Sequence, residues 1–421
     1  MPHPTAPNAP ARWVSGILVI FTLMGLGFGS WLSRIPAVRD HLGASTVEMS
    51  LLGLTLAAGS VTGLLLSGRS VAWLGPRRAL SIGIVVQLLA MPVASVLLWI
   101  GAVPAAVVCL AIFGFAFSTC DVAMNVSGAN AERALDRPRM PLLHAGYSLG
   151  SVAAMGIGAL AEAAAIPVPV HLSVMFALIT AGVFAALLPV PRDEDAHAVD
   201  RDPLPGGAPN THTGPMRVVP ADAPAEARPG RTRAYSPWRD PRILLIGGIA
   251  LSAGLAEGAA SDWLPLALAD GRELSNQSAT LMLGAFFVAM MLTRAAGSWL
   301  LVRFGRVATL RGGGILLAIG IASVILIPTA WGALLGALLW GVGGALGFPV
   351  AVSASADDPA KAVRSVAAVA AMSYTAFLLG PMLFGFLGER FGLLPSFWPL
   401  IAFAVFAVVA APAAREPGRR S

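Results

Sequence analysis

The sequence predicts an all-α integral membrane protein with twelve transmembrane helices in two pseudo-symmetric six-helix bundles. Three observations lead to this fold class. Apolar residues make up 56% of the chain and charged residues only 12%, whereas soluble domains contain roughly 45–50% and 25%. Apolar runs long enough to cross a hydrocarbon core of about 30 Å recur along the whole chain. The two halves of the chain also repeat one another at a nearly constant spacing.

The internal repeat is visible in short matching segments. Residues 45–75 align with residues 275–305 at an offset of 230, and Gly114 aligns with Gly341 at an offset of 227. Parallel repeats of this kind place two bundles around a central site near the bilayer midplane, which is an architecture of secondary transporters. The repeat therefore bears on function as well as on fold.

The first predicted span shows the pattern that the others follow. Residues 13–32 form an uninterrupted run without charge. Arg34 follows in place of a small-residue cleavage site, so we expect this span to remain in the mature protein. The spans predicted for the first half are 13–33, 46–68, 79–100, 104–128, 141–164 and 170–190. Those predicted for the second half are 242–268, 276–302, 309–328, 331–353, 366–387 and 396–413.

Basic residues indicate the orientation, because Lys and Arg accumulate in loops that stay in the cytoplasm. With the N-terminus inside, 23 of the 28 basic residues fall in inner tails and loops, four fall in outer loops, and Arg294 lies within a span. Both termini are therefore expected to be cytoplasmic. The net charge of +6 reflects this topology and not nucleic-acid binding, since the arginines are scattered among short loops.

One long polar stretch divides the chain. Residues 191–241 are dense in Pro, Gly, Ala and charge and hold too few large apolar residues to fold alone. We expect a flexible cytoplasmic linker between an N-terminal bundle at 1–190 and a C-terminal bundle at 242–414, with a cytoplasmic tail at 415–421. A regulatory binding segment is the alternative interpretation of this stretch.

The fourth predicted span carries a polar stripe. Its members recur at steps of three and four and so share one helical face: Gly114, Ser118, Asp121, Asn125, Gly128 and Glu132. An Asp at the centre of a membrane helix costs roughly 2.5–3.5 kcal/mol on insertion scales. We therefore expect Asp121 to face a cavity or a partner. The alternative is an Asp held by neighbouring hydroxyls that only fixes helix packing.

The fifth span places His144 and Tyr147 on one face, and the repeat pairs them with Ala371 and Tyr374 of the eleventh span. Histidine is the side chain that titrates near neutral pH when it is unperturbed. His144 is therefore a candidate proton relay, with an interfacial hydrogen-bonding role as the alternative. Because the second copy has alanine at the position of this histidine, the two halves are expected to have different roles.

The seventh span holds Glu257 close to mid-depth, beside Gly258 and Ser261. A carboxyl group that alternates between a buried environment and a neighbouring cation can bind and release a proton. Glu257 is the predicted proton-coupling carboxylate, and a permanent ion pair with Arg294 is the alternative. Asp262 lies about 140° further around the helix, so we expect it on another face, where it gates or packs near the outer side.

Two positions in the eighth and tenth spans remain open to two interpretations each. Arg294 can extend toward water, or it can face inward to neutralise Glu257 or hold a substrate carboxylate. Trp340 lies mid-span, where its indole can stack on a sugar ring or simply pack. Gly344 and Gly347 follow it, and such small residues let helices approach closely.

The turn between the second and third spans carries a family resemblance. Residues 68–78 resemble the loop signature of the major facilitator superfamily, and residues 298–306 resemble a weaker second copy. Segments at 31–36, 121–125 and 257–263 resemble poorly characterised bacterial members that are distantly similar to sugar permeases. The gating-loop residues that the resemblance implies are Gly68, Gly75, Arg77, Arg78, Gly305 and Arg306.

The resemblance implies the fold of that superfamily, a bacterial inner membrane, and a cavity lined by the first, fourth, seventh and tenth spans. Two departures limit it. The acidic residue usual at the fifth position of the loop signature is replaced by Ala72 and Val302, so no charge-based lock is expected there. Drug and proton antiporters of the superfamily typically carry an arginine in the fourth span, where this chain has Asp121.

We expect a secondary transporter that takes up a small polar solute, such as a sugar or related metabolite, together with a proton by alternating access. Proton-coupled efflux of an amphipathic compound is the alternative, and a non-transporting solute receptor is a third interpretation. The predicted proton-coupling residues are Glu257, Asp121 and His144. The predicted substrate-binding residues are Asn125, Ser118, Tyr147, Arg294, Asp262, Trp263, Trp340 and Tyr374.

The expected partners are the small-molecule substrate, a proton or other ion gradient, and the lipid bilayer, with the chain as a monomer. The chain has one lysine, Lys361, which is followed by Ala362, so no P-loop for nucleotide hydrolysis is present. Cysteines and histidines are scattered without metal-ligand spacing. No nucleophile and base pair stands out, and we expect neither metal nor cofactor nor enzymatic activity.

Overall fold

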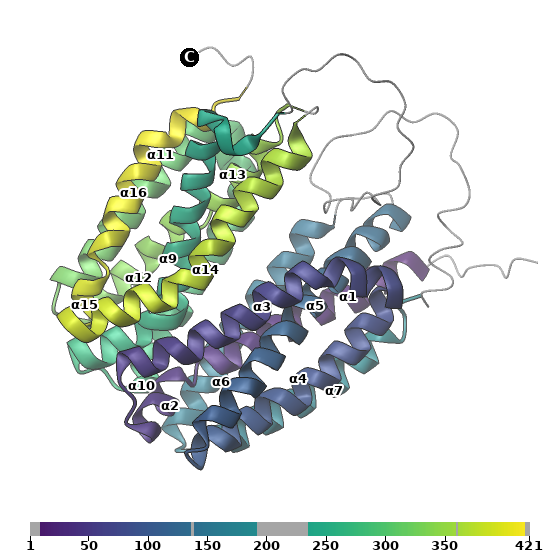
Figure 1. Cartoon of the computed structure of the whole chain (residues 1–421), viewed down its shortest axis with the longest axis vertical. Coiled ribbons are helices and arrows are strands. Elements are labelled where there is room, and N and C mark those ends of the chain that lie inside the picture. The colour runs from purple at the N-terminus through teal and green to yellow at the C-terminus, as the bar shows by residue number, and fades with distance from the viewer. Residues whose placement is uncertain (1–8, 136–138, 192–234, 359–360, 417–421) are drawn as a thin grey trace, which may run out of the picture.

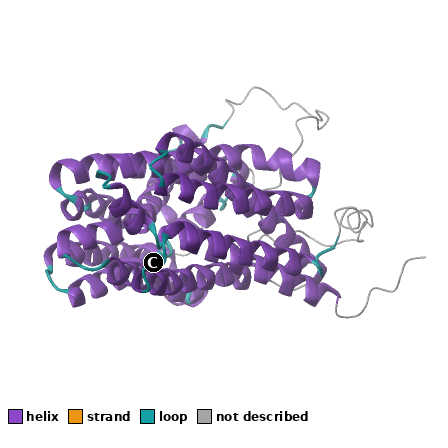
Figure 2. Cartoon of the chain, turned by 90° about the horizontal axis from the view of Figure 1, so that it is seen from below, coloured by secondary structure: helices purple, strands orange, loops and turns teal. Residues whose placement is uncertain are grey.

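The computed structural model describes residues 9–135, 139–191, 235–358 and 361–416, and the secondary structure in these ranges is helical (Figures 1 and 2). The first half forms α1 (Ala9–Leu32), α2 (Ile35–Leu42), α3 (Thr46–Leu74), α4 (Pro76–Trp99), α5 (Val103–Leu135), α6 (Met140–Ala163) and α7 (Val168–Leu187). The second half begins with η1 (Pro237–Arg239), α9 (Pro241–Arg272), α10 (Asn276–Ala295) and α11 (Gly297–Leu326). It ends with α12 (Ala330–Gly344), α13 (Gly347–Ser355), α14 (Ala362–Phe391), α15 (Leu393–Ser396), α16 (Trp398–Ala410) and η2 (Ala411–Ala414).

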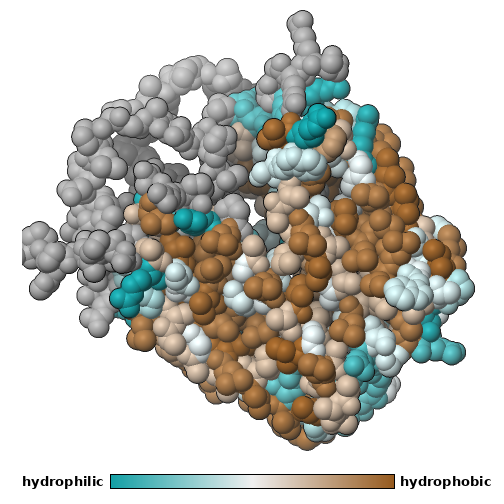
Figure 3. All heavy atoms as spheres, turned by 180° about the vertical axis from the view of Figure 1, so that it is seen from behind, coloured by the Kyte–Doolittle hydropathy of each residue, from teal (hydrophilic) through white to brown (hydrophobic). Residues whose placement is uncertain are grey.

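The predicted fold class is confirmed. Eleven stretches of the described chain are long and apolar enough to cross a membrane. The remaining predicted span corresponds to α6, a helix of 24 residues that packs against α1 and α10. Apolar side chains cover much of the surface seen from behind in Figure 3, as expected for helices that face lipid. Most of the predicted linker at 191–241, and the tail from residue 417, lie outside the described residues.

Two of the predicted spans are interrupted in the structure, and several others differ in their ends, as at Leu74 and Leu135. The eighth span was expected to run unbroken to residue 302, but α10 ends at Ala295, and α11 continues through a non-helical residue at Gly305. The tenth span was expected to be continuous over 331–353, but it breaks between α12 and α13 at Ala345 and Leu346. Glycine is a poor helix former, and Gly343, Gly344 and Gly347 surround this second break.

The backbone conformation of the turns is the same at equivalent positions of the two halves. Gly75 and Gly305, which occupy equivalent positions of the repeat, have φ angles of 82° and 76°. Gly43 and Glu273 are equivalent in the same register, and their φ angles are 59° and 54°. Because L-residues rarely adopt positive φ, its recurrence at matched positions shows that the turns were duplicated along with the helices.

Helix packing repeats as well. A Cβ atom on Gly114 would collide with the carbonyl oxygen of Leu56, and one on Gly341 would collide with that of Phe286. Leu56 and Phe286 are themselves equivalent positions of the repeat. Each glycine therefore allows the same close approach between equivalent helices of the two halves.

The two halves meet at one end of the molecule and diverge toward the other (Figure 1). We call these the closed end, where α2 and α15 lie, and the open end, where α1 and α9 begin and α16 ends. Contacts between the halves run through α6 with α10 and α3 with α14. The buried apolar core follows the same division: one cluster contains residues of both halves, whereas a second belongs to the first half and a third to the second half.

Candidate functional site

The polar stripe of α5 lies on a partly exposed face of that helix. Asp121, Asn125 and Ser118 are each half-buried. The side-chain amide of Asn125 donates to the backbone carbonyl of Asp121 at 2.8 Å and approaches its carboxylate Oδ1 at 3.4 Å. No charged group of the described residues forms a salt bridge with Asp121, so this carboxylate has no fixed counter-ion in the structure.

Glu257 of α9 and Arg294 of α10 form an ion pair within the second half. Arg294 Nη2 lies 2.9 Å from Glu257 Oε2, and their side chains are 37% and 26% exposed, Arg294 being the more exposed. Arg294 Nε also donates to the backbone carbonyl of Ala345, 3.2 Å away, in the break between α12 and α13. In this structure Arg294 is therefore paired with Glu257 and bonded to the backbone at the break in the tenth span.

Two side chains of the first half, both on α6, also belong to this polar region. Tyr147 of α6 lies within electrostatic range of Asp121, Glu257 and Arg294. His144 lies within range of Arg294 and packs edge-on against the ring of Phe21, with 5.3 Å between the ring centres. The structure therefore brings together side chains from α5, α6, α9 and α10 that sequence reasoning had placed on separate spans.

These side chains also lie at a similar depth. At a rise of about 1.5 Å per residue, five of them lie about 22–27 Å from the closed-end terminus of their own helices: Asp121, Tyr147, Glu257, Arg294 and Tyr374. Tyr374 of α14 is 39% exposed and lies within electrostatic range of Asp121. We call these five residues, together with His144, the central polar layer.

Asp262 lies on α9 nearer the closed end than Glu257. Among the central residues of α9, Glu257, Gly258, Ser261 and Asp262 are half-buried, whereas most of their neighbours are buried. The accessible stripe of α9 is therefore wide enough to include both acidic residues, although about 140° separates them around the helix. Asp262 lies one and a half turns closer to the closed end than Glu257, and no described residue makes a hydrogen bond to its carboxylate.

The two tryptophans predicted to bind substrate are buried in this conformation. Trp340 has no exposed surface, and its Nε1 donates to the carbonyl of Ala256 at 3.1 Å. The rings of Phe286 and Phe397 pack edge-on against it. Trp263 is 2% exposed, and its Nε1 has no partner among the described residues. Trp340 thus matches the packing interpretation in this state.

The predicted gating loops lie at the open end. Gly68 is in the last part of α3, and Arg77 and Arg78 are in the first turn of α4. Arg77 donates to the backbone carbonyl of Val190 at the end of the first half. This contact joins two segments of one half.

The second copy of the loop likewise makes its contacts within one half of the chain. Arg306 Nη1 lies 2.8 Å from Asp357 Oδ1, and Arg242 Nη2 lies 2.6 Å from Asp357 Oδ2. These ion pairs join α9, α11 and the segment after α13, all within the second half. The charges of this loop therefore stabilise one bundle.

Sequence reasoning missed the polar contacts that join the halves at the closed end. Arg39 of α2 donates to both carboxylate oxygens of Asp270 at 2.6 Å. Asn276 donates to Asp40 at 2.6 Å. We call these four residues the closed-end latch. The sequence carries a signal for this contact, since Arg39 and Asp270 have opposite charges and both lie in predicted outer loops.

Two further polar contacts join the halves at this end. Thr46, at the start of α3, donates through its hydroxyl to the Glu389 carboxylate of α14 at 2.6 Å. The hydroxyl of Thr280 donates to the backbone carbonyl of Ser33 at 3.3 Å and is buried. Polar contacts and the shared apolar core therefore close this end of the molecule together.

Comparison with known proteins agrees with this architecture. The family model described as Major Facilitator Superfamily matches residues 139–375 and 246–419. An uncharacterised transporter of Sinorhizobium fredii is 29% identical over 406 residues, which cover 95% of this chain and 98% of the relative. An uncharacterised MFS-type transporter of Yersinia pestis is 27% identical over 380 residues, covering 90% of this chain and 89% of the relative.

Solved structures share the fold. The crystal structure of the nucleoside transporter NupG superposes with a TM-score of 0.71 at 16% identity, covering 96% of this chain and 98% of that chain. A bacterial homologue of the human lysosomal transporter Spinster, in an inward-facing and unoccupied conformation, gives a TM-score of 0.66 at 14% identity with 97% of each chain covered. At these low sequence identities, the similarity shows a shared fold alone.

Proposed function

This chain belongs to the major facilitator superfamily and is a membrane transporter, and we propose that it takes up a small polar solute together with a proton. Substrate class, direction and coupling are the proposal. The observation that carries it is the half-exposed ion pair between Glu257 and Arg294, which lies at the depth where the two halves face each other.

The ion pair supplies a means of coupling. While Arg294 neutralises Glu257, the carboxylate remains charged. When the cation moves away, the carboxylate loses its counter-ion, and we propose that it takes up a proton at that point. A helix movement or a substrate group that separates Glu257 from Arg294 would therefore load a proton, and re-formation of the pair would release it.

The central polar layer favours a polar substrate. Asp121, Tyr147 and Tyr374 offer hydrogen-bonding groups at one level, and Asn125 adds an amide about one turn away on α5. A polar solute exchanges hydrogen bonds with water for hydrogen bonds with these groups. An amphipathic compound would instead need apolar aromatic surface at this depth, and Trp263 and Trp340 are buried away from it.

The orientation of the protein in the membrane is inferred from the distribution of its basic residues. Most basic residues of the described ranges lie in segments at the open end, and such residues stay on the cytoplasmic side. We therefore assign the open end to the cytoplasm of a bacterial cell and the closed end to the outer face of the inner membrane. In this assignment the structure is an inward-facing state, and uptake requires the closed end to open and the open end to close.

Uptake into proteoliposomes under an imposed pH gradient tests the proposal. A panel of sugars and related polar metabolites is screened with the wild type, and Glu257→Gln is then compared with it. We expect the wild type to accumulate a polar solute when the gradient is inward, and Glu257→Gln to lose that dependence.

Glu48→Gln is the matched control. Glu48 completes a capping box at the exposed start of α3, and glutamine preserves that hydrogen bond. This variant is expected to transport like the wild type. Uptake that ignores the gradient in the wild type and in Glu257→Gln alike would contradict proton coupling, and gradient-driven export would reverse the direction.

A further inference from the structure

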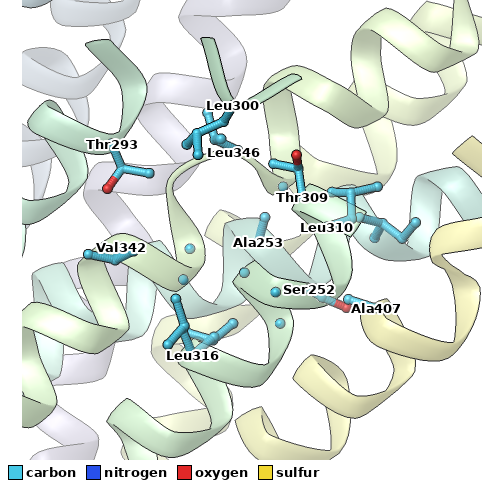
Figure 4. A pocket seen from close by; sticks show the side chains of 18 of the residues that line it. Ser252, Ala253, Thr293, Leu300, Thr309, Leu310, Leu316, Val342, Leu346 and Ala407 are labelled. Atoms are coloured by element: carbon cyan, nitrogen blue, oxygen red, sulfur yellow. The ribbon is translucent and has the colours of Figure 1, made fainter. Parts of the chain in front are cut away.

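A cavity lies inside the second half of the chain, and none of the six residues of the central polar layer lines it. It has a volume of about 260 Å³ and lies among α9, α10, α11, α12 and α16. Figure 4 shows Val342 of α12, Thr309 of α11 and Ser252 of α9 around this space. Leu346 and Gly347 also line it, so the cavity adjoins the break between α12 and α13.

The cavity exists because glycines form part of its wall. Gly344 of α12 is buried, yet a Cβ atom added there would meet no other atom within 4 Å. The missing side chain of Gly344 therefore faces the empty space. Protein interiors are close-packed, and an empty apolar cavity lowers stability in proportion to its volume. A space of this size is large enough for a ligand, since a cavity of about 150 Å³ holds benzene.

The wall is apolar apart from a few hydroxyl groups. The hydroxyls of Ser252 and Thr293 donate to backbone carbonyls of their own helices, at 2.7 and 2.8 Å. The hydroxyl of Thr309 is buried and has no partner among the described residues. The cavity therefore offers apolar walls and a single unused hydrogen-bonding group, which suits a hydrocarbon chain with one polar end.

The mouth of the cavity lies on the lipid-facing side of α11. Ala308 and Gly312 line the cavity and are exposed. They recur with the exposed Ile315 and Ile319 at steps of four, three and four, which is one face of a helix. An exposed apolar face on a membrane-spanning helix lies against acyl chains, so the cavity opens toward the bilayer.

The depth of Thr309 also fits a lipid. The part of α11 that follows the turn at Gly305 is long enough, at about 1.5 Å per residue, to cross a hydrocarbon core of about 30 Å. Thr309 lies just over one helical turn beyond Gly305, or about 6 Å along the helix axis. It therefore lies just inside the boundary at which the ester groups of phospholipids meet their acyl chains.

We propose that this cavity binds one acyl chain of a membrane phospholipid, with the Thr309 hydroxyl donating to the ester carbonyl of that chain. The bound chain fills the space beside the break between α12 and α13. The site differs from the central polar layer in chemistry, because its lining is apolar and includes the exposed residues Ala308 and Gly312 of α11.

Photolabelling in nanodiscs tests the proposal. The probe is a phosphatidylcholine that carries a diazirine in one acyl chain, and labelled peptides are mapped by mass spectrometry. Gly344→Leu fills the cavity, and Gly156→Leu on α6 is the matched control, because an added Cβ there also meets no atom within 4 Å. We expect the wild type and Gly156→Leu to be labelled at residues 308–317, and Gly344→Leu to lose most of this labelling.

A second measurement keeps the proposal open to refutation if Gly344→Leu does not fold. Phosphatidylcholine added to the detergent-solubilised wild type is expected to raise its melting temperature, and Thr309→Val is expected to reduce that rise. Thr293→Val is the control, because its hydroxyl is already bonded within α10. Wild-type labelling confined to other helices, or equal labelling of Gly344→Leu, would overturn the proposal. An unchanged rise for Thr309→Val would overturn the ester contact.

Discussion

At the scale of single residues, Arg294 shows why charge alone does not describe a site. Its Nη2 binds Glu257 on α9, while its Nε binds the carbonyl of Ala345 between α12 and α13. One side chain thus ties three helices through donors that point in different directions. A lysine has the charge but lacks the rigid planar fork that makes both bonds at once.

We therefore predict that Arg294→Lys impairs transport despite keeping the charge. Loss of one charge-assisted hydrogen bond is expected to lower the initial uptake rate about tenfold, since such bonds contribute about 1.5–3 kcal/mol. Uptake into proteoliposomes measures this. Arg303→Lys, at an exposed position near the open end, should leave the rate unchanged. An uptake rate equal to the wild type in Arg294→Lys would mean that only the charge matters.

A second residue-scale prediction concerns backbone conformation. Ala165, between α6 and α7, has a φ of 52°, and Gly392, its counterpart in the second half, has a φ of 87°. Alanine is disfavoured at positive φ by roughly 1–2 kcal/mol, and glycine is not. Allowing for the greater entropy of glycine in the unfolded chain, we expect Ala165→Gly to raise stability by up to about 1 kcal/mol.

Thermal unfolding in detergent checks this prediction. Ala164→Gly is the control, because Ala164 has a φ of −83°, which alanine adopts freely. That variant should be no more stable than the wild type. If both glycine variants change the melting temperature in the same direction, strain at Ala165 is not the cause.

At the scale of elements, the short helix α2 connects the two halves. It carries Arg39 and Asp40 to Asp270 and Asn276, so the closed-end latch depends on a short segment outside the main helices. The other face of α2 carries Ile35 and Val38, which are buried in the apolar cluster shared by the two halves, so a movement of α2 would change the packing between the halves.

We predict that Asp270→Asn shifts the molecule toward the state in which the closed end is open. Exposed ion pairs contribute about 0.2–1 kcal/mol, so the equilibrium between the two states should change by up to about fivefold. Distances between spin labels on α2 and α9 measure the populations. Glu273→Gln, at the exposed C-terminal cap of α9, is the control. Identical distance distributions for all three proteins would exclude a gating role for the latch.

At the scale of the whole molecule, the repeat explains how much was predictable from the sequence. Apolar runs predicted the helices, and the repeat aligned the segments that end at Gly75 and Gly305, where the structure has its matched turns. The repeat did not identify the break in the tenth span, because several neighbouring glycines could each interrupt a helix. Pairs such as Arg39 with Asp270 were also missed, because contacts between loops depend on how the two bundles are tilted in one state of the cycle.

The candidate site was predictable to a similar extent. The period of a single helix determines which of its side chains share a face, and so the sequence predicts that Asp121 and Asn125 lie side by side on one helix. The relation of Tyr147 to Glu257 and Arg294 depends on rotations of helices in both halves, which periodicity does not determine. Burial of Trp340 likewise depends on aromatic neighbours from other helices.

A prediction for the whole molecule concerns rigid-body movement. Asp40 and Asn276 are replaced by cysteine in a chain whose own two cysteines have been removed, and a short cleavable bifunctional thiol reagent joins them. We expect cross-linking to stop uptake and cleavage of the reagent to restore it, because alternating access requires this end to open. Each single cysteine variant treated with the same reagent is the control. Full uptake by the cross-linked protein would contradict movement at the closed end.

The division of the apolar core bears on how the protein is made. One cluster is confined to the first half and another to the second, and only the cluster at the closed end is shared. Each half can therefore begin to pack as soon as its own helices have left the ribosome and entered the bilayer, before its counterpart is synthesised. The same arrangement implies fragment complementation: two polypeptides divided between α7 and α9, produced in one cell, should assemble through that shared cluster into a working transporter.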